Sequence, residues 1–391
     1  MPMDSVENLL GILQRMRVMT PQEVDEIARE LAPCFNDPLD LARYLVEVEW
    51  LTDYQVELLF GDRWEELSIG PYLILDRLGE GGVSEVFRAW DTIKGHQVAL
   101  KVMRQNLTDR TAAAREFQRE LQAVTRLSHP NVIQIHDAQR IGALHYFAME
   151  YVEGLDLDRH VRRMGQLPLD RACEYIRQVA LGLQHAHQVG LVHRDIKPAN
   201  LFLVKPPDRR GSDALVKILD WGLARVRLEA GGETDCAEID RDIEKGMLIG
   251  TADYIAPEQA RDPCLVDIRA DIYSLGCTLY FLLTGEPPFR GASLMQKLLQ
   301  HQDAERPKVR GVRPDVPEEL AAVVLRMMAR QPEERYPIPL LVAGALRHFA
   351  HGATGRPAWS SSNAPSPGSS PSLGTCKPAT MIALSSEGVH G

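Results

Sequence analysis

The sequence predicts an α+β protein in which a small helical module precedes a larger domain. Short apolar, β-branched runs at 72–75, 86–90 and 97–102 are typical of strands. The next stretch, 111–127, is rich in Ala, Arg, Glu and Gln, and its apolar residues recur near helical spacing. Residues 1–68 carry a series of helix-start signals instead.

The first 68 residues predict about four short helices. One apolar stripe at helical spacing consists of Val6, Leu9, Leu10, Leu13 and Met16. Thr20 can cap a second helix, because a proline follows it and Glu23 completes a capping box. Asp37 and Thr52 mark two further starts.

The apolar residues near the end of this module have two interpretations. They are Trp50, Leu51, Tyr54, Leu58 and Leu59. We favour a core role, because a module this small needs most of its apolar residues inside. Self-association or docking through residues 1–68 is the alternative, and the sequence does not indicate what the module does.

A glycine-rich stretch joins the first two predicted strands. It consists of Leu78, Gly79, Glu80, Gly81, Gly82, Val83, Ser84, Glu85 and Val86. Glycine adopts positive φ and lets backbone amides approach a phosphate without a Cβ in the way. The stretch predicts a hairpin able to hold phosphates, although such a run alone is more often an ordinary turn.

The strand at 97–102 contains one lysine, Lys101, and a buried cation needs partners. On the following predicted helix, Glu120 lies on the apolar side and is the best candidate for an ion pair with Lys101; Glu116, one turn earlier, is the second candidate. A phosphate would complete the surroundings of Lys101.

Residues 193–200 contain three groups suited to phosphoryl transfer. The stretch reads His193-Arg194-Asp195-Ile196-Lys197-Pro198-Ala199-Asn200. The reaction needs a carboxylate to orient the acceptor hydroxyl, a cation to neutralise the moving phosphoryl group and an oxygen to hold magnesium. Asp195, Lys197 and Asn200 have these chemistries in this order. The strand at 216–219 then delivers Asp220, a second candidate magnesium ligand.

These motifs, closed by Ala256-Pro257-Glu258, resemble in kind and order those of protein kinases. Lys197 two residues after Asp195, together with the run 250–258, resembles the serine/threonine class. The run 81–86 resembles bacterial eukaryotic-like serine/threonine protein kinases. The resemblance implies a two-lobed protein kinase fold at 69–352, with an antiparallel-sheet N-lobe and a mainly helical C-lobe.

The resemblance also implies the reaction and its site. Such an enzyme transfers the ATP γ-phosphate to Ser/Thr hydroxyls of proteins, including itself, with ATP and Mg²⁺ as cofactors. The implied catalytic residues are Asp195, Lys197, Asn200 and Thr251, and the implied metal ligands are Asn200 and Asp220. The implied ATP-binding residues are 78–86, Ala99, Lys101, Glu120, Met149, Glu150, Val152, Asp156 and Phe202.

Each of these ATP-binding residues has an implied place. Val86 and Ala99 would cover the adenine from above and Phe202 would lie beneath it. Met149 would precede a hinge, whose backbone at Glu150, Tyr151 and Val152 would pair with adenine, and Asp156 would reach the ribose.

Other residues have implied structural roles. Asp271 would hold the backbone of the catalytic loop (residues 193–200), Glu258 and Arg335 would form an ion pair, and His193 would pack the loop in place. Trp221 replaces the usual phenylalanine, and this larger ring should resist swinging into the ATP pocket.

The acidic segment 221–257 departs from the pattern, because Thr234 is its only threonine before position 251. Arg194 is of the kind that gathers an activating phosphate. We hypothesise that Asp242 or Glu244 supplies this negative charge permanently, and loss of activity on phosphatase treatment would refute the hypothesis. A merely solvated charged loop explains the composition equally well.

Composition agrees with an intracellular enzyme. The net charge of −10 argues against nonspecific binding of nucleic acid, and the six scattered cysteines argue against a disulfide framework or zinc site. The sequence shows neither a signal peptide nor a membrane-spanning run, which predicts a cytoplasmic location. Residues 353–391 are rich in Ser, Pro and Gly and predict a disordered tail.

Two other functions agree less well with these motifs. A pseudokinase-type signalling scaffold would lack catalytic groups, whereas Lys101, Asp195, Asn200 and Asp220 are all present. A small-molecule phosphotransferase would not be expected to combine the run 250–258 with Asp271 and Arg335.

Overall fold

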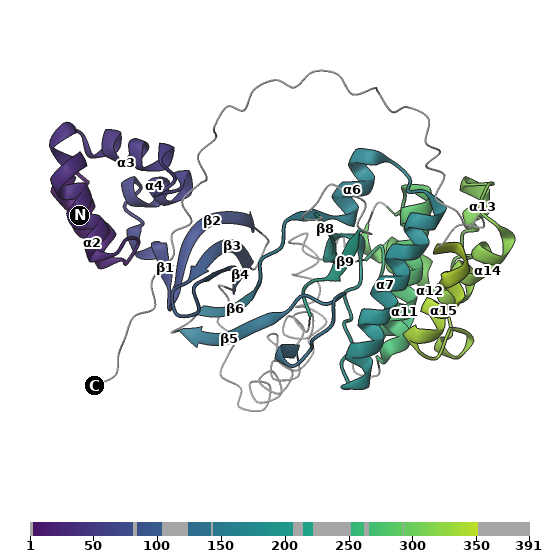
Figure 1. Cartoon of the computed structure of the whole chain (residues 1–391). Helices are drawn as coiled ribbons and strands as arrows, with labels where there is room; N and C mark the ends of the chain where they lie inside the picture. Colours follow the sequence, from purple (N-terminus) through teal and green to yellow (C-terminus); the bar gives the residue numbers. More distant parts are fainter. Residues whose placement is uncertain are drawn as a thin grey trace, which may run out of the picture.

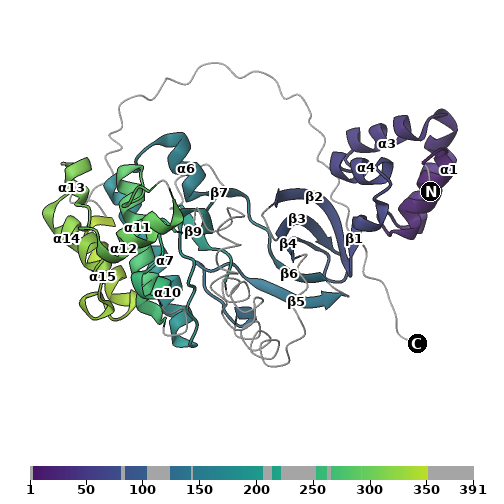
Figure 2. The ribbon, with the colours of Figure 1, turned by 180° about the vertical axis from the view of Figure 1, so that it is seen from behind.

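The computed structural model describes residues 3–80, 84–103, 124–141, 144–205, 214–221, 252–261, 266–291 and 293–350. Along the chain it contains a helical module, a curled antiparallel sheet and a helical lobe (Figure 1). The module lies at the end of the sheet remote from the helical lobe, as the opposite view also shows (Figure 2). The predicted tail at 353–391 lies outside the described residues.

The helical module contains the four predicted helices: α1 (Val6–Arg15), α2 (Pro21–Glu26), α3 (Pro38–Glu47) and α4 (Asp53–Phe60). Thr20, Asp37 and Thr52 cap α2, α3 and α4 as the sequence predicts. A π-helical turn (Ile27–Leu31) and a 3₁₀ turn (Ala32–Cys34) connect α2 to α3, and a second 3₁₀ turn (Trp64–Leu67) follows α4.

The module has a core of its own, in which Leu9, Leu13, Leu41, Leu45 and Leu58 are fully buried. Leu51 and Leu59 are buried too, which confirms the core interpretation for these leucines. Tyr54 is different: its ring packs against Phe87, with the ring centroids 6.2 Å apart. One of the five apolar residues therefore contacts the neighbouring sheet.

The N-lobe sheet has the strand order β1-β2-β3-β4-β6-β5, and all its pairings are antiparallel. The strands are β1 (Ser68–Ile69), β2 (Tyr72–Glu80), β3 (Ser84–Asp91), β4 (His96–Met103), β5 (Ile135–Ile141) and β6 (Leu144–Glu150). The sheet curls, so that the Tyr72 hydroxyl at the start of β2 reaches Asp137 on β5 and donates to it over 3.1 Å. Of the predicted helix at 111–127, residues 111–123 lie outside the described residues.

The C-lobe is mainly helical. Its helices are α6 (Leu157–Met164), α7 (Leu169–Gln188), α10 (Pro257–Arg261), α11 (Ile268–Thr284), α12 (Leu294–Asp303), α13 (Val309–Val312), α14 (Glu318–Met327) and α15 (Pro339–Ala350). A small sheet of β7 (Gly154–Asp156), β8 (Leu201–Val204) and β9 (Leu215–Ile218) lies on the side facing the N-lobe (Figure 1).

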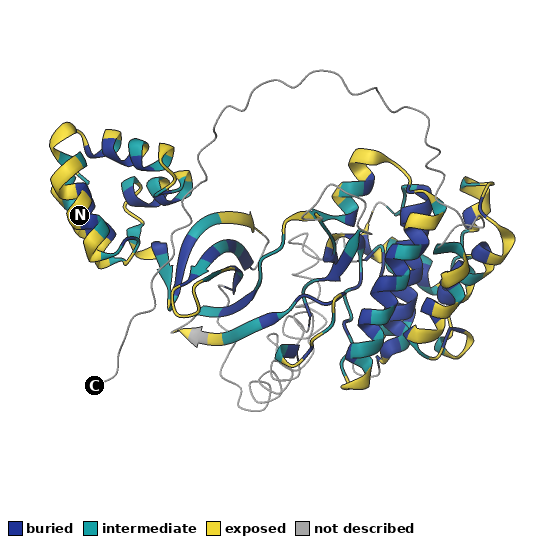
Figure 3. Cartoon of the chain, viewed as in Figure 1, coloured by how far each residue is buried: buried dark blue, intermediate teal, exposed yellow. Residues whose placement is uncertain are grey.

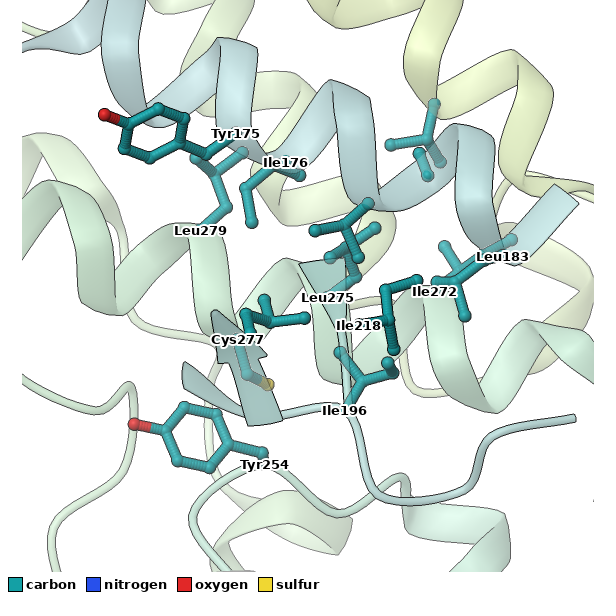
Figure 4. Packing of buried hydrophobic residues seen from close by; sticks show 14 of the residues in the cluster. Tyr175, Ile176, Leu183, Ile196, Ile218, Tyr254, Ile272, Leu275, Cys277 and Leu279 are labelled. Carbon is teal, nitrogen blue, oxygen red and sulfur yellow. The ribbon is translucent and has the colours of Figure 1, made fainter. Parts of the chain in front are cut away.

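The C-lobe core forms around α7 and α11, whose inner faces are buried (Figure 3). Ile176 and Leu183 of α7 meet Leu275 and Leu279 of α11 in this core (Figure 4). Ile196, one residue after Asp195, points into the same core, and so does Ile218, two residues before Asp220. Apolar burial thus anchors both segments that carry the candidate catalytic groups. Within the described part of the chain, no helix is long and apolar enough to span a membrane.

Candidate active site between the two lobes

Asp195 is the centre of a small hydrogen-bonded cluster. Lys197 Nζ lies 2.9 Å from Asp195 Oδ2, and the Asn200 side-chain amide donates to the same oxygen over 3.0 Å. The Asn200 amide also donates to the backbone carbonyl of Asp195 over 2.7 Å. The other carboxylate oxygen, Asp195 Oδ1, is buried and has no hydrogen-bond partner among the described residues. A buried acceptor of this kind is ready to receive a hydroxyl donor.

The backbone before Asp195 is held by Asp271, which is fully buried on α11. Its two carboxylate oxygens accept hydrogen bonds from the backbone N–H groups of His193 (2.8 Å) and Arg194 (2.7 Å). Burial raises the pKa of Asp271, while these two hydrogen bonds act in the opposite direction. The predicted contact between Asp271 and the loop backbone is confirmed.

Arg194 has a φ of +67°, in the left-handed region that non-glycine residues seldom occupy. Its N–H is bonded to Asp271, and its carbonyl accepts from the Gln259 side chain over 2.7 Å. Such a conformation persists only where the surroundings fix it, and here hydrogen bonds fix it from both sides.

His193 is buried and links the loop to the residues around Asp220. The Asp195 N–H donates to His193 Nδ1 over 3.2 Å, so Nε2 carries the proton and donates to the Leu219 carbonyl over 2.8 Å. The His193 and Trp221 rings also pack edge to face, with centroids 4.8 Å apart. Both ring nitrogens are therefore engaged within the loop, which agrees with the packing role expected for His193.

Asp220 follows β9 and lies close to the catalytic loop, because the Leu219 N–H donates to the Asn200 carbonyl over 2.9 Å. Its φ of +62° is again left-handed. Asp220 Oδ2 lies 2.7 Å from Lys101 Nζ, and the Lys101 side chain is only 5% exposed. The candidate lysine from the N-lobe and the candidate metal ligand from the C-lobe thus form an ion pair. Glu120 and Glu116 lie outside the described residues.

One face of the N-lobe sheet carries the residues expected to surround the nucleotide. Val86 is opposite Lys101 in the β3–β4 ladder, and Ala99 is opposite Met149 in the β4–β6 ladder. Lys101 and Ala99 are two residues apart on one strand, so all four residues lie on one face of the sheet. Phe87 and Leu100 lie on the other face, in a separate apolar cluster.

The predicted glycine-rich hairpin is confirmed as far as the structure describes it. Gly79 pairs with Val86 and Glu80 with Glu85 at the ends of β2 and β3, while Leu78 is 44% exposed. Gly81, Gly82 and Val83 lie outside the described residues, as does Thr251.

The hinge candidates, Glu150 to Val152, begin at the last residue of β6. The Glu150 N–H is already donated to the Gln134 carbonyl (2.9 Å), so adenine would pair with the Glu150 carbonyl and the backbone beyond it. The Glu150 side chain forms an ion pair with Lys217 of β9 (2.6 Å). The sequence did not lead us to this pair, although a single lysine in the strand at 216–219 was a visible signal.

Asp156 is opposite Phe202 in the β7–β8 ladder, so the expected ribose and adenine contacts are neighbours. Asp156 is also the N-cap of α6, where its side chain accepts from the Arg159 N–H over 2.8 Å. The carboxylate therefore has a structural function in addition to the expected one.

The Glu258–Arg335 pair is confirmed and closely fitted. The Arg335 side chain is completely buried and makes two parallel contacts with the Glu258 carboxylate, of 2.6 and 2.7 Å. Its remaining donors bond the backbone carbonyls of Ala329, Arg269 and Arg330. This arrangement fixes α10 against the start of α11.

The oxygen atoms at the site suit magnesium. The Asn200 side chain directs its nitrogen to Asp195, which leaves the amide oxygen as a candidate ligand, and Asp220 adds a carboxylate. Magnesium prefers oxygen ligands and is often held by one or two protein groups together with substrate phosphates. In the described ranges, the structure contains no cluster of three or more His, Cys, Asp or Glu side chains that could hold a metal ion.

Comparison with known proteins identifies the family. Residues 72–345 match the model of the protein kinase domain. The serine/threonine-protein kinase PknB of Mycolicibacterium smegmatis is 39% identical over 271 residues, which are 68% of this chain and 40% of the relative. The serine/threonine-protein kinase PrkC of Bacillus subtilis is 35% identical over 68% of this chain and 38% of its own length. The chain thus spans well under half the length of these relatives.

Solved structures agree with this assignment. The crystal structure of the Mycobacterium tuberculosis PknI kinase domain is 28% identical and superimposes with a TM-score of 0.56, over 72% of this chain and 98% of that one. The fold, the ordered motifs and the family match lead to one conclusion. The chain belongs to the protein kinase family, in the group of bacterial eukaryotic-like serine/threonine kinases.

Proposed function

We propose that this protein transfers the γ-phosphate of ATP to serine and threonine hydroxyls of proteins, including its own. The observation that carries the proposal is the cluster around Asp195. One oxygen of this carboxylate is engaged by Lys197 and Asn200, and the other is buried without a partner among the described residues. Lys101 and Asp220, joined across the two lobes, supply the other charged groups that the reaction needs.

The residues of the site divide the work between binding and transfer. The face with Val86, Ala99 and Met149 covers the adenine, and Phe202 lies beneath it. Lys101 binds the α- and β-phosphates. Asn200 and Asp220 would hold the magnesium ion, which would neutralise charge on the phosphates.

Transfer itself depends on position and charge. Asp195 Oδ1 accepts the hydrogen bond of the incoming hydroxyl and aligns its oxygen with the γ-phosphorus. Lys197, 2.9 Å from the other oxygen of the same carboxylate, stabilises the negative charge of the moving phosphoryl group. As the hydroxyl oxygen bonds to phosphorus and the bond to ADP breaks, Asp195 takes up the hydroxyl proton. Thr251 would bond both Asp195 and Lys197.

A polypeptide acceptor is favoured by the buried Glu258–Arg335 pair. This ion pair holds α10 against the start of α11, and Gln259 of α10 bonds the Arg194 carbonyl of the catalytic loop. The pair thereby supports a rigid docking surface for an extended polypeptide. The alternative is a signalling scaffold that keeps this fold without catalysis. Docking or self-association through residues 1–68 and a cytoplasmic location remain predictions.

The test is transfer of labelled phosphate from Mg-ATP by the purified chain, alone and with a generic protein substrate, followed by identification of the phosphorylated residue type. Phosphoserine and phosphothreonine in either reaction support the proposal. Absence of transfer in both reactions would leave the scaffold as the better account, and label on tyrosine alone would contradict the serine/threonine assignment.

A further inference from the structure

The helical module contacts the glycine-rich hairpin at an irregular point of β2. The register of β2 with β3 passes from Ile74 opposite Ala89 to Asp76 opposite Arg88, so Leu75 is an extra residue, a β-bulge. On the other side of β2, β1 pairs only with Tyr72 and Leu73. The backbone after Leu73 therefore lies on an open edge of the sheet.

Helix α4 lies beside β2 (Figure 1), and two side chains at its start cover this edge. The Gln55 amide donates to the Ile74 carbonyl over 2.8 Å, and the Thr52 hydroxyl donates to the Leu75 carbonyl. Gln55 is only 2% exposed, so its amide group cannot exchange this partner for water. Tyr54, between them in sequence, packs on Phe87 of β3.

The same two side chains also begin α4. Thr52 Oγ1 accepts from the Gln55 N–H (3.2 Å), and Gln55 Oε1 accepts from the Thr52 N–H (3.0 Å), which is a complete capping box. Each side chain thus accepts from the helix and donates to the strand. A helix cap needs only the acceptors, so the two donors serve the bulge.

The bulge lies a few residues before the part of β2 that is expected to contact ATP. A second register shift lies between Arg77 and Gly79, and the glycine-rich tip follows directly. Bulges increase the local twist of a strand and re-aim the residues beyond them. The direction in which β2 enters the tip therefore depends on how its backbone is held at Ile74 and Leu75.

We propose that Thr52 and Gln55 are positioning residues for ATP, which hold the β2 bulge and so set how the end of β2, at Gly79 and Glu80, lies beside the nucleotide. This inference rests on the proposed kinase function and extends it to a module outside the matched family range. On this account, the start of α4 affects ATP binding through its hydrogen bonds to β2, without contacting the nucleotide.

Gln55→Glu is the decisive variant. A carboxylate keeps the oxygen that accepts from the Thr52 N–H, and glutamate is as good as glutamine in a capping box, but in its ionised form it has no donor for the Ile74 carbonyl. The matched control is Glu23→Gln in the capping box of α2, whose side chain bonds only Thr20 in the described part of the chain. Both variants are made in the full chain, and thermal unfolding is recorded for each.

The binding of Mg-ATP and the KM for ATP are then measured at pH 8. We expect Gln55→Glu to weaken Mg-ATP binding and raise the KM about five- to tenfold, as the loss of one buried hydrogen bond suggests, with little change in kcat. Glu23→Gln should match the wild type. A cap that served only stability would lower the unfolding temperature and leave the KM unchanged, and this result would overturn the inference.

A second pair of variants decides the matter if Gln55→Glu does not fold. Thr52→Ser keeps both the cap and the hydroxyl donor, whereas Thr52→Asp keeps the cap and loses the donor. Only Thr52→Asp should weaken Mg-ATP binding, and equal binding by both would overturn the inference. If the wild type itself binds no Mg-ATP, the proposed function fails first.

Discussion

Lys101 Nζ and Asp220 Oδ2 lie 2.7 Å apart, so an ion pair joins the sheet of the N-lobe to the end of β9 in the C-lobe. Lys101 is almost completely buried, and Asp220 holds the left-handed backbone conformation noted above. A lysine buried in this way needs negative partners, and in the proposed reaction the ATP phosphates join the carboxylate. The pair thus brings the proposed phosphate-binding cation and the candidate metal ligand to one place.

Lys101→Met should lower kcat/KM for ATP about 100- to 1000-fold, because it removes the charge next to the phosphates. Steady-state kinetics with Mg-ATP measures this loss. Lys217→Met is the matched control, since Lys217 is also a buried strand lysine with a carboxylate partner, Glu150. Both variants should lose stability, but only Lys101→Met should lose most of its rate, and equal losses of rate would contradict the assignment.

Arg335→Lys should destabilise the protein by about 3 kcal/mol, because one ammonium cannot replace a guanidinium that bonds Glu258 twice and three backbone carbonyls. Urea unfolding measures the change in the free energy of unfolding. Arg269→Lys serves as the control, because the ion pairs of Arg269 with Asp267 and Glu333 are at the surface. This substitution should lower the free energy of unfolding by less than about 1 kcal/mol. Similar values for both variants would refute the special role of Arg335.

His301 should make stability depend on pH. Burial lowers its pKa to about 4, and the Tyr273 hydroxyl lies 2.7 Å from its Nδ1. Between about pH 4 and 6.5 the unfolded chain therefore binds more protons at this residue than the folded chain, so the free energy of unfolding falls as the pH falls. From pH 8 to pH 5 the loss from this residue is about 2 kcal/mol.

His301→Gln should abolish the part of the pH dependence of stability that comes from this histidine. Unfolding free energies of wild type and variant, measured at pH 8 and pH 5, give the difference directly. The penalty of the substitution should shrink by about 2 kcal/mol at the lower pH. A penalty that is the same at both pH values would show that His301 does not titrate in this way.

Trp221 is buried against His193, which supports the expectation that its ring resists displacement into the ATP pocket. Trp221→Phe should therefore bind inhibitors that require this displaced ring about tenfold more tightly, since a smaller ring loses less buried surface. Inhibitors that compete with ATP without displacing the ring provide the control and should bind both proteins alike. Equal affinity for the first class would contradict the expectation.

The sequence predicted the parts of the site that depend on local motifs. Residues 193–200 carry Asp195, Lys197 and Asn200 within one short segment, so the contacts among these side chains could be predicted. The contacts of Asp271 and Arg335 were also foreseen, through the resemblance to the kinase family. The caps of α2, α3 and α4 followed from capping signals within three residues.

Contacts between distant segments were not foreseeable from local patterns. A capping box at Thr52 and Gln55 predicts a helix start, but it does not reveal that both side chains also donate to β2, about twenty residues later. The pair between Lys217 and Glu150 likewise depends on how β9 packs against the end of β6. Such contacts arise from the tertiary packing of elements, whereas capping and periodicity act within a single element.

The most direct test of the central claim compares phosphate transfer by the wild type and by Asp195→Asn, with Mg-ATP binding measured for both. Asparagine keeps the size of the side chain but cannot take up the hydroxyl proton. We expect Asp195→Asn to bind Mg-ATP like the wild type and to transfer phosphate at about one thousandth of its rate or less. Transfer at the wild-type rate by Asp195→Asn would contradict the account.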